Sequence, residues 1–174
     1  MGILTFNEIS KETIDNLRVP VEEKSGVIDD VINAIISKYC GELDNYVEFI
    51  HSILADSANP PTNDELDNFC MNLATLIYFA GSMCEQIGIR DDISRAVYKE
   101  VYNTSRNAQE KGTVADKDTA AELQSQPAQI VNICYNRAYR IMKAKVDNAQ
   151  ELLGSCKKVV SRRMSELELT HLQR

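Results

Sequence analysis

Apolar residues recur at three- and four-residue spacings from Val27 onward, which is the pattern of amphipathic helices rather than of strands. The first run extends to about residue 56. Gly41 near its middle predicts two helices, over about 27–39 and 42–56. Asn59-Pro60-Pro61 then predicts a loop, because proline cannot continue a helix.

A second apolar run follows this loop. Thr62 and Glu65 have the spacing of a capping box, in which each side chain satisfies a backbone N–H at the start of a helix. Gly88 is expected to cap the C-terminal end of that helix. The acidic pair Asp91 and Asp92 then favours the start of a further helix.

The longest helix is expected near the C-terminus. Pro127 suits a first helical turn, so the helix is predicted over about residues 128–167, near 60 Å at 1.5 Å per residue. The pattern therefore predicts one all-α domain, an antiparallel helical hairpin or bundle with a long C-terminal helix. Its regions are a flexible lead-in at 1–24, an acidic helical region at 25–112, and a linker with the long basic helix at 113–174.

On a helical wheel, residues 130–163 divide into two faces. The apolar residues lie between about 20° and 160° from Arg137, and most of the cations lie between about 200° and 360°. A stripe of this length suits a nucleic acid backbone, because each neutralised phosphate releases counterions. The candidate nucleic-acid-binding cations are Arg137, Arg140, Lys143, Lys157, Lys158 and Arg162.

Two other interpretations of this stripe stay open. Charged helix faces are commonly just solvated, and cations near a helix C-terminus favour its dipole, which accounts for Lys157 and Lys158 but not for Arg137. Tyr135 and Tyr139 flank the first cations, where they are candidates for base stacking or simply for packing at the rim of the core.

Lys145 and Arg163 depart from the stripe. They are five helical turns apart and lie within the apolar face. Either their aliphatic stems extend past the core to water, or they pair with acids of the N-terminal half. We expect pairing, across a helix or subunit interface.

Charge distribution supports such pairing. The net charge is −7. Residues 1–92 hold 5 Lys and Arg against 17 Asp and Glu, a balance of −12, and residues 93–174 hold 14 against 9, a balance of +5. This asymmetry predicts two surfaces with different partners.

Composition narrows the setting. No apolar run approaches the ~18 residues of a membrane span, and the N-terminus lacks a signal peptide's basic and apolar blocks, so a cytoplasmic, non-membrane protein is expected. The five cysteines are widely spaced, which predicts reduced and mostly buried thiols.

Catalytic and metal-binding motifs are sparse. Glu48-x-x-His51 and Glu168-x-x-His171 have the spacing of di-iron ligands, but no second pair of deep Glu residues accompanies them. There is no phosphate-binding loop or nucleophile elbow. We expect a non-enzymatic protein without metal or cofactor.

The last 80 or so residues resemble a known family. The sequence TVADKDTAAELQ at 113–124 resembles a segment just ahead of the last helix in the phage recombination-mediator family typified by UvsY. The sequence YNRAYRIMKAKVDNAQELLGSCKKVVSRRMSEL at 135–167 is similar in character to phage helical proteins often grouped with that family. The resemblance implies a helical hairpin, self-assembly into a homo-oligomer and binding of single-stranded DNA. It also implies partnership with a recombinase and a single-strand-binding protein in the cytoplasm of a phage's host.

The sequence thus leads to one function hypothesis and one alternative. The first is a single-stranded-DNA-binding recombination mediator that self-assembles and helps load a recombinase. The alternative is a helical structural or interaction protein whose basic face docks an acidic protein partner.

Overall fold

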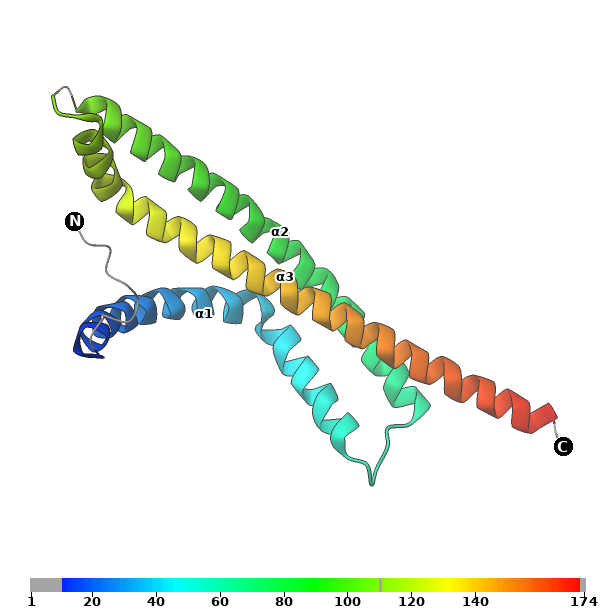
Figure 1. Ribbon diagram of the computed structural model, residues 1–174. Helices are drawn as coiled ribbons and strands as arrows, with labels where there is room; N and C mark the ends of the chain where they lie inside the picture. The colour runs from blue at the N-terminus through cyan, green and yellow to red at the C-terminus, as the bar shows by residue number, and fades with distance from the viewer. Residues whose placement is uncertain (1–10, 110, 173–174) are drawn as a thin grey trace.

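Over the residues that the structure describes, the chain folds into three helices, two of which form a long antiparallel hairpin (Figure 1). The computed structural model describes residues 11–109 and 111–172, with side chains from residue 22 to residue 169 apart from 24 and 110. The helices are α1 (Lys11–Ala55), α2 (Asn63–Ala108) and α3 (Val114–Leu172), and no strand occurs in these ranges. The all-α prediction is confirmed.

α2 and α3 form the hairpin, and α1 packs against one side of it (Figure 1). The Asn72 amide donates to the Tyr46 hydroxyl over 3.2 Å, which joins α1 to α2. The Lys145 ammonium bonds Asp44 over 2.7 Å, which joins α1 to α3. The part of the hairpin nearer the α2–α3 loop extends beyond this three-helix region as two helices.

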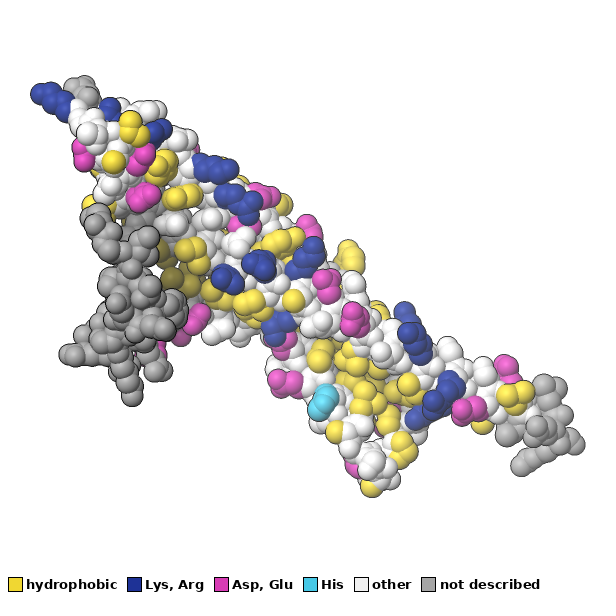
Figure 2. Space-filling model, viewed as in Figure 1, with side chains coloured by type: hydrophobic (Ala, Val, Ile, Leu, Met, Phe, Trp, Pro, Cys, Tyr) yellow, Lys and Arg dark blue, Asp and Glu magenta, His cyan; other side chains and the backbone are white. Residues whose placement is uncertain are grey.

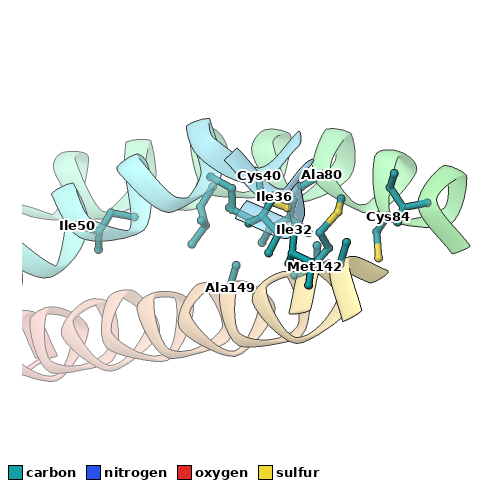
Figure 3. Close-up of a cluster of buried hydrophobic side chains, with 14 of the residues drawn as sticks. Ile32, Ile36, Cys40, Ile50, Ala80, Cys84, Met142 and Ala149 are labelled. Atoms are coloured by element: carbon teal, nitrogen blue, oxygen red, sulfur yellow. The ribbon is translucent and has the colours of Figure 1, made fainter. Parts of the chain in front are cut away.

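The core lies where the three helices meet (Figure 3). Leu43 and Ile50 enter it from α1, Leu73 from α2, and Met142 from α3, all at most 2% exposed. Burying a side chain of this size contributes about 1.5–3 kcal/mol. This packing, more than intrinsic helix propensity, holds the long helices together.

Two expected helix breaks are absent. α1 continues through Gly41 and α2 continues through Gly88, so the predicted ends at both glycines are wrong. A glycine inside a helix costs about 1 kcal/mol relative to alanine. Tertiary packing along both sides of each glycine offsets that cost, and sequence pattern alone does not reveal such packing.

Gly88 instead provides room for a side chain of α3. The ring of Tyr139 lies against it, and a Cβ atom built at Gly88 would meet Tyr139 Cε2 at 3.0 Å. Since the backbone there is helical, the absence of a side chain and not a special torsion explains the glycine.

Replacing Gly88 with valine should therefore destabilise the protein. The added methyl groups would displace the Tyr139 ring, and overpacking of this kind costs about 1–3 kcal/mol. Gly81 is the matched control, because it is also inside α2 and a Cβ there meets nothing within 4 Å. Urea unfolding should give a lower midpoint for Gly88→Val and an unchanged or higher one for Gly81→Val; equal midpoints would contradict the packing role.

Helix starts were predicted unevenly. The capping box is confirmed: Glu65 N–H donates to Thr62 Oγ1 over 3.3 Å, and Thr62 N–H donates to Glu65 Oε2 over 2.7 Å. A second pair of capping residues, which was not predicted, lies at the start of α3. Thr113 N–H donates to Asp116 Oδ2 over 2.9 Å, and Asp116 N–H donates to Thr113 Oγ1.

The expected linker and lead-in are largely helical. α3 begins at Val114, so Pro127 lies inside it and not in its first turn. Proline removes one backbone donor, and the first turns of α3 are set at an angle to the rest (Figure 1). α1 begins at Lys11, so residues 11–24 belong to this helix; residues 1–10 lie outside the described residues.

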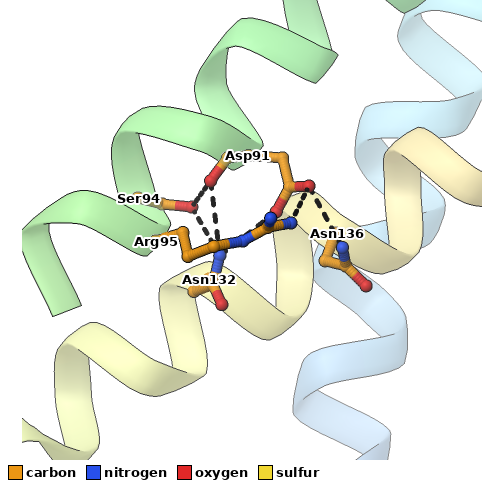
Figure 4. A network of polar contacts seen from close by, with 5 residues as sticks. All are labelled: Asp91, Ser94, Arg95, Asn132 and Asn136. Atoms are coloured by element: carbon orange, nitrogen blue, oxygen red, sulfur yellow. Dashed lines mark hydrogen bonds and ion pairs between the residues drawn. The ribbon is translucent and has the colours of Figure 1, made fainter. Parts of the chain in front are cut away.

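A buried polar network joins α2 to α3 beyond the three-helix core (Figure 4). Asp91, 4% exposed, accepts from the Asn132 amide over 3.1 Å, the Asn136 amide over 3.0 Å and the Arg95 guanidinium over 2.9 Å. Asn132 also donates to Ser94 Oγ over 3.0 Å. These bonds can form only in one alignment of the two helices, so the network fixes the register of the hairpin.

Candidate nucleic-acid interface

The eight cations between residues 130 and 165 of α3 fall into two groups in the structure. Six are exposed, and they are the six candidate phosphate-binding residues: Arg137, Arg140, Lys143, Lys157, Lys158 and Arg162. The other two, Lys145 and Arg163, are half-buried. The helical wheel separated the same two groups.

Lys145 connects α3 to α1. Its ammonium lies 2.7 Å from Asp44 Oδ1, and the two side chains are 35% and 32% exposed. A partly exposed pair of this kind contributes about 0.5–1 kcal/mol. The expected partner from the acidic half of the chain is thus present within one subunit.

Arg163 has a different kind of partner. Its Nη1 donates to the carbonyl oxygen of Pro61 over 2.6 Å and to Asn63 Oδ1 over 3.4 Å. Within the described part of the chain the guanidinium binds the end of the α1–α2 loop and no carboxylate, so the pairing expected for Arg163 is not found inside one subunit, and pairing across a subunit interface stays a prediction. A loop carbonyl needs a donor when it is buried, and Arg163 supplies one.

The six exposed cations are nearly free of carboxylate partners. Arg162 Nε lies 3.5 Å from Glu166 Oε1, in a pair whose side chains are 75% and 65% exposed. The other five form no ion pair within the described part of the chain. Their charge is therefore available to a ligand, since it is not used to hold helices together.

The exposed line of α3 has an ordered sequence of charges. Following the three- and four-residue spacing from Arg137 to Arg162, its residues are Arg, Arg, Ala, Asp, Glu, Gly, Lys and Arg. Asp147 and Glu151 form the centre of this line and are both exposed. Figure 2 shows the alternation, with acidic side chains between groups of basic ones along the hairpin.

We therefore describe two clusters. Cluster 1 is Arg137, Arg140 and Lys143, and cluster 2 is Lys157, Lys158 and Arg162. At 1.5 Å per residue their centres are about 28 Å apart, and the whole line spans about 37 Å. The sequence indicated one basic stripe diluted only by Asp147 and Glu151; in the structure these two acids are exposed at its centre, between two basic ends.

The two tyrosines that are candidates for base stacking lie at the edge of this line and also pack against the core. Tyr139 packs on Gly88, and both rings contact the hydrophobic core. Tyr135 lines a shallow, mainly apolar groove between α2 and α3 with Ile93 and Val131, and Arg90 lies at this groove too. Both rings are half-buried and keep part of their surface exposed, so base stacking by Tyr135 and Tyr139 stays a prediction.

The remaining candidate groups give no second site. Burial raises the pKa of Cys40 to about 11, and Asp44 adds to this effect. Cys84, Cys134 and Cys156 are also buried, and Cys70 is half-buried. Glu48 and His51 are exposed on α1, and the side chain of His171 lies outside the described residues. Among the described residues, no three His, Cys, Asp or Glu side chains are grouped to hold a metal ion.

Comparisons with protein-family models, curated proteins and solved structures found no match. None of the described helices is both long and apolar enough to cross a membrane.

The polar network at Asp91 is the feature that the sequence interpretation missed. Asp91 was taken as a helix start, whereas it is buried inside α2. Asn132 and Asn136 lie four residues apart, on the same face of α3. In most helical hairpins the residues of the face that packs against the other helix are apolar. These two amide side chains on one helix face were the signal in the sequence from which a polar network between the helices could have been predicted.

Proposed function

We propose that the protein binds single-stranded nucleic acid along α3 and acts as an oligomeric recombination mediator. Cluster 1 and cluster 2 would neutralise phosphates of one strand. The observation that carries the proposal is the division of the α3 cations: two are used for contacts within the fold, and six remain exposed.

The shape of the line favours a single strand over a duplex. The cations follow one helix for about 37 Å. That distance corresponds to about 11 nucleotides at the 3.4 Å spacing of a stacked strand. A flexible strand can follow this row, whereas a stiff duplex meets a straight row at fewer phosphates.

Phosphate contacts carry no sequence information, so binding would be general. Generality suits a mediator, which must act on any strand. Self-assembly would add several weak sites on one strand and raise the avidity. The acidic α1 and the N-terminal half of α2 would then be left for neighbouring subunits, for a recombinase or for single-strand-binding protein.

Direct titration tests the proposal. A labelled oligonucleotide of about 16 nucleotides should bind in about 50 mM salt, and a duplex of the same length should bind more weakly. Polyglutamate of similar total charge is the control for the alternative function. Equal binding of polyglutamate and oligonucleotide would favour an acidic protein partner instead, and no binding of either would exclude a general anion-binding role for α3.

A further inference from the structure

The acidic side chains at the centre of the α3 line, Asp147 and Glu151, form no contact within the described residues that would stabilise the fold. The side chains of Asp147 and Glu151 are exposed, and neither forms an ion pair within the described ranges. The Glu151 backbone carbonyl accepts from Ser155, but the carboxylate takes no part in that bond. These two charges are therefore not required to neutralise the neighbouring cations or to hold α3 against α2.

Their position determines their effect on a bound strand. Asp147 and Glu151 lie on the exposed line itself, between the clusters, so a strand following the line would pass directly over them. Phosphates there would meet two carboxylates with no cation interposed. Like charges at such short range repel, and the repulsion is strongest at low salt.

We infer that α3 holds a single strand at two separate anchors, with the segment between them repelled from the helix surface. The inference rests on the proposed function and specifies its ligand: a strand long enough to reach both clusters. Each cluster alone provides three cations, which gives weak binding. When a strand is already bound to one cluster, its binding to the second cluster is intramolecular. A strand long enough to reach both clusters therefore binds much more tightly than a short one.

The two anchors set a length requirement. Their centres are about 28 Å apart, or about 8 nucleotides at 3.4 Å each. A strand of about 5 nucleotides reaches only one cluster, whereas one of about 16 reaches both even when it arches over the centre. The nucleotides between the anchors would keep their bases free of the protein, and so available for pairing or for a second protein.

Length-dependent binding is the first part of the test. The affinity of oligothymidylates of about 5, 8, 12 and 16 nucleotides should rise in one step, about 100-fold or more, once both clusters are reached. Lys157→Ala with Lys158→Ala and Arg162→Ala should abolish the step and leave weak binding to all lengths. A smooth rise with length in the wild type would overturn the two-anchor arrangement.

Neutralising the centre is the second part. Asp147→Asn with Glu151→Gln should raise the affinity for the long strand about fivefold and leave the short strand nearly unchanged. The matched control is Asp92→Asn with Glu100→Gln, which removes two exposed acids from α2 and changes the net charge equally. An equal effect of both variants would overturn the inference while binding itself persists. Absence of all binding would overturn the proposed function together with the inference.

Discussion

Replacing Lys157, Lys158 and Arg162 with alanine is expected to lower the affinity for a long single strand by about 100-fold or more in about 50 mM salt. Cluster 2 supplies half of the exposed cations of α3, and each phosphate contact to a single strand adds about 0.7 to the slope of log affinity against log salt concentration. The slope of the variant should therefore be shallower than that of the wild type by about 2. Fluorescence anisotropy at several salt concentrations measures both quantities.

A matched variant separates position from net charge. Lys38, Lys99 and Lys111 are also exposed lysines, and none lies on α3. Replacing these three with alanine changes the net charge by the same amount but should leave the slope nearly unchanged. Equal losses in the two variants would mean that the binding depends on total charge and not on the α3 line.

Replacing Asp91 with leucine is expected to destabilise the fold by about 3 kcal/mol. The change leaves the Asn136 amide and the Arg95 guanidinium without their acceptor in a partly buried space, and an unsatisfied buried donor costs about 1–3 kcal/mol. Asn132 loses one acceptor but keeps its bonds to Ser94 Oγ and to the backbone carbonyl of residue 91. For a chain of this size the melting temperature should fall by about 6–12 °C. Thermal unfolding followed by circular dichroism measures the shift.

Two further variants make this test specific to the network. Asp92→Leu alters the exposed neighbour and should change the stability by less than about 0.5 kcal/mol. Asp91→Leu combined with Asn132→Leu and Asn136→Leu removes donors and acceptor together, so it should recover much of the lost stability. A triple variant as unstable as Asp91→Leu would show that the network is not what Asp91 contributes.

The sequence predicted correctly those features that depend only on residues close to one another in the chain. The capping box at Thr62 and Glu65 depends on neighbours three residues apart, and it was predicted correctly. The inward position of Lys145 followed from helical periodicity, because the periodicity alone determines which face a residue occupies.

Contacts between helices were the part that the sequence could not supply. A glycine such as Gly88 is typical of a helix end, and only its contact with the Tyr139 ring of α3 explains why it lies inside a helix. The partner of Arg163 was likewise expected to be an acid, but the nearest acceptor is a loop carbonyl. The acids of the exposed line were visible in the sequence, but only the structure shows that five of the six cations around them form no ion pair within the described residues.

The central claim is that the exposed cations of α3 bind the phosphates of one strand. The most direct test is the salt dependence of wild-type binding to an oligothymidylate of about 16 nucleotides. Six phosphate contacts predict a slope of about −4 for log affinity against log salt concentration, starting from measurable binding in about 50 mM salt. A slope near zero, or no binding at that salt concentration, would contradict the account.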